Sequence, residues 1–109
     1  ARIVKVAGGD AAIERSVLEL YMTDAEQRIA ALKQEIDAGD LERGRITAHS
    51  LKGASGNVGC AAMQRKAFEI EEHAAAGRRG EAGALLPELD RLFLQTRALL
   101  FAFLADHTG

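Results

Sequence analysis

Hydrophobic residues recur at three- and four-residue steps along most of this chain, which is the spacing of an amphipathic helix. Asp10 is a suitable N-cap for the first such segment. Its apolar positions are Ile13, Val17, Leu18 and Tyr21, followed by Ile29, Leu32 and Ile36. Between the two sets, Thr23 or Asp24 either starts a second helix or marks a kink in one long helix. Residues 37–40 read as a helix end with a glycine C-cap and a new N-cap.

Three further helical segments follow. The pattern predicts a helix from about residue 41 to residue 58, ending at Gly59, and another over residues 62–76. Residues 77–80 form the next break. The last helix starts near Ala82 or at Pro87, which either begins or kinks it, and runs to Leu104. The core positions predicted for these segments are Met63, Ala67, Ile70, Ala74, Leu85, Leu89, Leu92, Phe93, Leu99 and Phe103.

The connections between these segments are short, so successive helices should pack antiparallel. We therefore predict an all-α fold, an antiparallel four-helix bundle with an additional N-terminal helix. The expected domain covers residues 1–109, with residues 1–8 as a lead segment. A single bundle buries the apolar faces of its helices in its own core, so a monomer is expected.

Composition narrows the range of functions. Hydrophobic residues make up 48% of the 109 residues and aromatic residues only 5%, so aliphatic side chains must fill the core. The net charge of −2 gives no reason to expect nucleic-acid binding, because such proteins usually carry an excess of basic residues. No apolar run reaches the length of a membrane span, and Cys60, the single cysteine, excludes an internal disulfide. The chain does not start with Met, and we expect it to be a fragment of a larger protein.

Chemistry concentrates in residues 48–59, whose sequence is AHSLKGASGNVG. Three glycines in seven residues are unusual in a helix, because each interior glycine costs roughly 1 kcal/mol relative to alanine. On a helical wheel, Gly44, Ala48, Leu51, Ser55 and Val58 share the core side. His49 points away from it, and Lys52, Gly53 and Gly56 flank it on the same stripe.

This arrangement suits a nucleophile that exchanges a group with another macromolecule. Neutral imidazole is available near pH 7, and its attack on an aspartyl phosphate would place the phosphoryl group on a ring nitrogen. Lys52 would offset the charge of the phosphoryl oxygens. Bare backbone at Gly53 and Gly56 would let a partner surface approach closely.

The motif His49-x-Leu51-Lys52-Gly53-x-Ser55-x-x-Val58-Gly59 resembles the signature of histidine-containing phosphotransfer (HPt) domains, helical bundles of multistep two-component phosphorelays. The resemblance implies phosphorylation of His49 at Nε2, with Lys52 as the basic helper and Gly53 keeping the surface open. It also implies response-regulator receiver domains or a hybrid sensor histidine kinase as partners. No cofactor is implied, because Mg²⁺ would belong to the receiver.

The resemblance extends to neighbouring residues. Glu71 matches a position that often holds a polar side chain beside the histidine, and it is either such a neighbour or a solvated charge. Arg45 lies about one turn before His49 on its stripe, and Ile46 and Asn57 are candidate receiver contacts. The family has no kinase activity of its own, and this sequence holds no nucleotide-binding loop. A cytoplasmic location is expected from the chemistry.

Other residues receive structural interpretations. Ser55 is expected to bond a backbone carbonyl one turn back. Cys60 is expected to be a small packing residue, and the pair at 78 and 79 a solvated turn. His73 and His107 lack ligand spacing to His49 or Cys60, so no metal site is predicted. Two alternative functions remain open: the phospho-accepting domain of a chemotaxis-type histidine kinase, and a helical bundle that docks receivers without chemistry.

Overall fold

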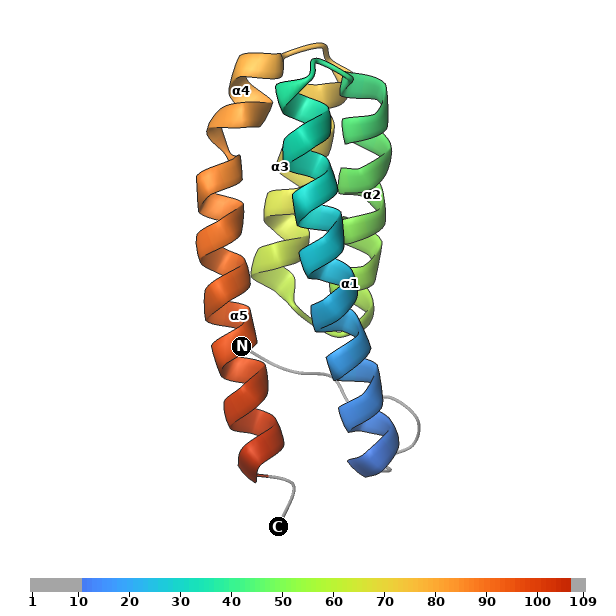
Figure 1. The fold of residues 1–109 in the computed structure, drawn as a ribbon, viewed down its shortest axis with the longest axis vertical. Coiled ribbons are helices and arrows are strands. Elements are labelled where there is room, and N and C mark those ends of the chain that lie inside the picture. Colours follow the sequence, from blue (N-terminus) through green and yellow to red (C-terminus); the bar gives the residue numbers. More distant parts are fainter. Residues whose placement is uncertain (1–10, 107–109) are drawn as a thin grey trace.

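The computed structural model describes residues 11–106, which form a helical bundle (Figure 1). Its helices are α1 (Ala11–Asp37), α2 (Leu41–Asn57), α3 (Ala61–Ala75), the short α4 (Arg79–Ala84) and α5 (Leu86–Asp106). The four long helices run alternately up and down, which confirms the predicted all-α antiparallel bundle. The predicted N-cap Asp10, the lead segment 1–8 and His107 lie outside the described residues.

The first 27 residues of the bundle form one continuous helix. The alternative of a separate helix starting at Thr23 or Asp24 is therefore wrong. Asp24 lies inside this helix, where its carboxylate pairs with Arg28 one turn later at 2.6 Å. Ala25 beside it is fully buried, so the core contact continues through this point.

Tight turns connect the helices at their ends. Gly39 and Gly59 follow α1 and α2 with φ of 78° and 79°, the left-handed conformation that favours glycine at a helix end. Asp40 then caps α2, since its carboxylate accepts from the backbone N–H of Arg43 at 3.2 Å. Pro87 is the second residue of α5, where its missing N–H costs no helical hydrogen bond.

Most predicted core positions are buried between these helices. On α2 they are Gly44, Ala48, Leu51 and Ser55, and on α3 they are Met63, Ala67, Ile70 and Ala74. The largest fully buried side chains are Leu32, Leu51, Met63, Ile70, Leu89 and Leu100. These residues fix which faces of α2 and α3 are turned outward.

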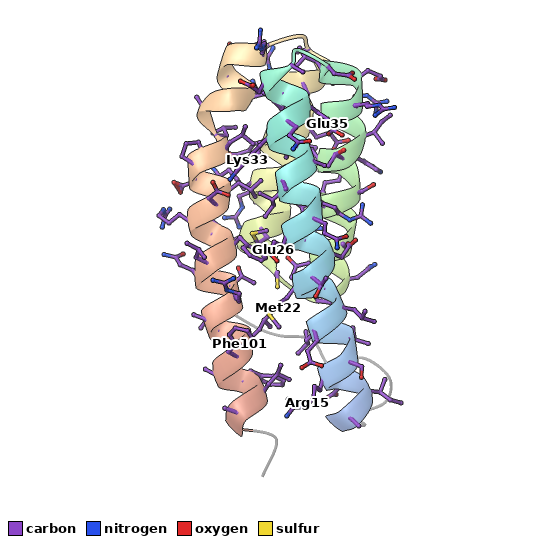
Figure 2. The ribbon with its side chains drawn as sticks, in the orientation of Figure 1. Arg15, Met22, Glu26, Lys33, Glu35 and Phe101 are labelled. Carbon is purple, nitrogen blue, oxygen red and sulfur yellow. The ribbon has the colours of Figure 1, made fainter. Side chains whose placement is uncertain are left out.

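Two predicted core residues, Ile13 and Leu99, are instead exposed. Ile13 lies in the first turn of α1, a segment that extends beyond the lower ends of α2 and α3 (Figure 1). Leu99 instead lines a small pocket with Cys60 and Ala62 at the start of α3. The buried positions in this part of α5 are Leu100 and Leu104. Met22, Glu26 and Lys33 line the side of α1 that faces α5 (Figure 2).

Two polar residues also differ from expectation. The Ser55 hydroxyl lies 2.8 Å from the Tyr21 hydroxyl, so Ser55 joins α2 to α1 instead of bonding its own helix. Arg79 is not part of a solvated turn. Its guanidinium donates to the carbonyl oxygens of Ile36, at 3.0 Å, and Asp37, and so caps the C-terminus of α1.

Candidate functional site

His49 lies at the middle of α2 on its outward face. The neighbouring Ala48 and Leu51 are fully buried and anchor the opposite face of the helix in the core. Because their positions hold the rotation of α2 fixed, the His49 side chain remains 63% exposed. The imidazole is thus carried on a rigid helix but is open to a large partner.

Glu71 of α3 holds the ring of His49. Its Oε2 lies 2.8 Å from Nδ1 of the imidazole. A carboxylate can only accept, so Nδ1 carries the proton in this contact. In the neutral ring, Nε2 then keeps its lone pair. The contact therefore directs the nucleophilic nitrogen away from α3 and towards solvent.

Lys52 completes a three-residue cluster. Its Nζ lies 2.9 Å from Oε1 of Glu71 and 5.0 Å from the centre of the Phe68 ring. The Lys52 side chain is only 25% exposed, so the ammonium group is held between a carboxylate and an aromatic face. His49 and Lys52 thus each contact one oxygen of the same carboxylate.

The Glu71 carboxylate stays ionised in this setting. Burial alone would raise its pKa, but the neighbouring Lys52 and His49 outweigh burial and lower the pKa below its ordinary value. The Glu71 side chain is 15% exposed. Its negative charge is a fixed part of the cluster at neutral pH.

The two glycines of the predicted stripe differ. A Cβ built on Gly53 would meet nothing within 4 Å, so the surface beside His49 is open there. A Cβ on Gly56 would lie 2.5 Å from Nε2 of Gln64, a side chain of α3. The Gln64 side chain therefore covers the surface at Gly56, which is not open as predicted.

The remaining predicted residues surround this cluster. The Arg45 guanidinium donates twice to the Glu42 carboxylate, at 2.8 and 2.9 Å, and this pair raises the pKa of Arg45. Ile46 and Asn57 are exposed. Phe68 was missed by the sequence analysis. Its spacing of three residues before Glu71 was the available signal, since it places both on one face of the helix.

The described residues offer no other reactive centre. Cys60 is buried and unpaired at the start of α3, as predicted for a packing residue. His73 accepts from the Arg78 guanidinium at 2.9 Å. Between residues 11 and 106, no three histidine, cysteine or acidic side chains gather as metal ligands do. None of the helices described combines the length and apolar character that crossing a bilayer requires.

Comparison with known proteins gives a consistent result. The sequence profile described as "Hpt domain" matches residues 16–99. The phosphorelay intermediate protein rdeA of Dictyostelium discoideum is 27% identical over 75 residues, which cover 69% of this chain and 30% of that protein. This chain thus spans less than a third of that relative's length.

A solved structure matches the fold over most of both chains. The crystal structure of histidine-containing phosphotransfer protein B (HptB) from Pseudomonas aeruginosa superposes with a TM-score of 0.82 and 32% sequence identity. The match covers 85% of this chain and 81% of that one.

Proposed function

We propose, from the premise that this chain belongs to the Hpt domain family, that it acts in phosphorelay signalling by carrying a phosphoryl group on Nε2 of His49. The observation that carries the proposal is the His49–Glu71 contact. It places the proton on Nδ1 and leaves Nε2 as the exposed nucleophile. A histidine without a role would not need a partly buried carboxylate to orient it.

The donor in this proposal is an aspartyl phosphate on a receiver domain. The Nε2 lone pair attacks phosphorus, the N–P bond forms, and the acyl O–P bond breaks to leave the receiver aspartate as a carboxylate. The ring becomes an imidazolium that keeps its Nδ1 proton against Glu71. The reverse reaction returns the phosphoryl group to a receiver aspartate.

Lys52 assists by placing positive charge near the moving phosphoryl oxygens. Its Nζ is held by the same carboxylate that orients the ring, which fixes its position beside His49. The Mg²⁺ ion expected in such a transfer belongs to the receiver in this proposal, which assigns it no ligand on this chain. No kinase activity is assigned to the chain itself.

The docking surface proposed for the receiver is the outward face of α2. Gly53 leaves it flat, and Ile46 and Asn57 are exposed on it one to two turns from His49. Arg45 lies at its edge, already paired with Glu42. The exposed side chain of Ile46 and the open backbone at Gly53 together suit the docking of a macromolecular partner. We place this exchange in the cytoplasm, with the chain acting as a monomer.

Transfer of label tests the proposal. The protein and its His49→Gln variant are incubated with a panel of receiver domains phosphorylated by radiolabelled acetyl phosphate and Mg²⁺. We expect an acid-labile, alkali-stable label on the native protein and none on the variant. Equal labelling of both proteins would refute His49 as the carrier. Labelling only by an ATP-loaded kinase domain would favour the chemotaxis-type alternative.

A further inference from the structure

One carboxylate serves both functional side chains of the site. Glu71 accepts from His49 through Oε2 and pairs with Lys52 through Oε1. When His49 is neutral, the positive charge of Lys52 and the negative charge of Glu71 cancel. The cluster therefore has no net positive charge with which to receive an anion.

Among the described residues of the His49 stripe, no other cation is free to supply that charge. Arg45 is the next basic residue on the stripe, and both of its contacting nitrogens are taken by Glu42. Lys52 is confined further by the ring of Phe68, 5.0 Å from its Nζ. For Lys52 to turn fully towards a phosphoryl group, it must give up Glu71.

A phosphoryl group on Nε2 brings a charge of about −1.5 to −2 near pH 7. The Glu71 carboxylate repels it and competes for Lys52. The same carboxylate holds the Nδ1 proton, so the ring can leave as neutral imidazole and not as imidazolate. The repulsion and the competition for Lys52 raise the free energy of the phosphorylated state relative to the free site, and the retained Nδ1 proton lowers the barrier to loss of the phosphoryl group.

We infer that Glu71 is a positioning residue whose negative charge shortens the lifetime of phosphohistidine 49 and shifts the transfer equilibrium towards the receiver. This inference rests on the proposed carrier function of His49. The ring needs only a hydrogen-bond acceptor for its orientation. The charge of that acceptor is what sets the lifetime.

The variant Glu71→Gln separates these two roles, because its amide oxygen can still accept from Nδ1 while the charge is lost. Glu69→Gln is the matched control. Glu69 also lies on α3 and pairs with a lysine, Lys66, at 2.6 Å. The substitution Glu69→Gln therefore removes the same charge from α3, but at a position outside the His49 cluster.

The experiment measures the lifetime directly. The native protein and the variants are phosphorylated with potassium phosphoramidate, and the signal assigned to His49 by its loss in His49→Gln is followed by ³¹P NMR. We expect a lifetime about fivefold longer in Glu71→Gln, the effect of one nearby charge. Glu69→Gln should match the native protein, and in 8 M urea all three should decay alike.

A second arm measures the equilibrium. The phosphorylated protein is mixed with a receiver domain and Mg²⁺, and Glu71→Gln should retain about fivefold more of the phosphoryl group than the native protein. A lifetime equal to or shorter than the native one, or an unchanged equilibrium, would overturn the inference while leaving the carrier function intact. Absence of any His49 signal in the native protein would refute the carrier function itself.

Discussion

The Nδ1 atom of His49 on α2 lies 2.8 Å from Oε2 of Glu71 on α3. The site is therefore built by two helices and not by the motif of α2 alone. Leu51 of α2 and Ile70 of α3 are fully buried in the core that holds these helices together. The orientation of the imidazole depends on this packing.

Filling the open surface beside His49 should block docking without harming the fold. We expect Gly53→Leu to slow phosphoryl transfer from a receiver roughly tenfold, which corresponds to about 1.4 kcal/mol of lost docking free energy. Its free energy of unfolding should rise by about 0.5–1 kcal/mol, because a helical glycine is replaced where no atom lies within 4 Å. Stopped-flow transfer and urea unfolding measure the two effects.

Gly80 provides the control, since it is equally open but lies on α4. Gly80→Leu should leave the transfer rate unchanged. A slow transfer in Gly80→Leu, or a normal rate in Gly53→Leu, would contradict the proposed docking surface.

Removing the charge of Lys52 should slow the chemistry. Lys52→Met keeps an unbranched side chain against Phe68 but loses the ammonium, and we expect roughly a tenfold lower rate constant for transfer at saturating receiver. The control is Lys33→Met, which removes an exposed ion pair with Asp90 on the α1–α5 side (Figure 2). If both variants transfer at the native rate, Lys52 has no part in the reaction.

The buried hydroxyl pair of Tyr21 and Ser55 should contribute to stability and not to transfer. Tyr21→Phe leaves the fully buried Ser55 hydroxyl without its 2.8 Å partner, so the free energy of unfolding should fall by about 1 kcal/mol. A double-mutant cycle with Ser55→Ala in urea isolates the pair. Additive effects of the two substitutions would show that the bond adds nothing.

Alkaline pH should destabilise the bundle through the same region. Burial raises the pKa of Tyr21 and of Cys60 above their ordinary values. As pH rises, the unfolded chain loses these protons first, near pH 8.5 for the thiol and about 10 for the phenol, while the folded protein keeps them. Stability must then fall with pH, by up to about 1.4 kcal/mol per unit for each group.

Urea unfolding between pH 8 and 11 checks this prediction. Above pH 10 the loss of stability should be shallower in Tyr21→Phe than in the native protein. Parallel curves for the two proteins would mean that Tyr21 ionises equally in both states.

Periodicity predicted the helices and their order, because buried positions such as Met63, Ala67 and Ile70 repeat along one face. It failed at Ile13 and Leu99, which follow the same pattern. The exposure of Ile13 depends on where α2 and α3 end, and that of Leu99 on how α5 lies against the start of α3, so both depend on the whole bundle. Local sequence also left a helix start and a kink both open at Asp24, where the structure has one continuous helix.

The motif predicted that Lys52 and Gly53 lie beside His49, but not that Glu71 connects Lys52 to His49. Lys52 and Gly53 follow from helical spacing alone. The shared use of Glu71 depends on the register of α3 against α2, 22 residues away from His49 in the sequence. For the same reason the covering of Gly56 by Gln64 could not be foreseen.

The most direct test of the account is to observe the bond itself. Protein labelled with ¹⁵N at histidine is phosphorylated by a receiver domain, and ¹⁵N–³¹P coupling identifies the nitrogen that carries phosphorus. The structure, in which Glu71 holds Nδ1, predicts coupling to Nε2 of His49 alone. Coupling to Nδ1 of His49, or to another histidine, would contradict the central claim.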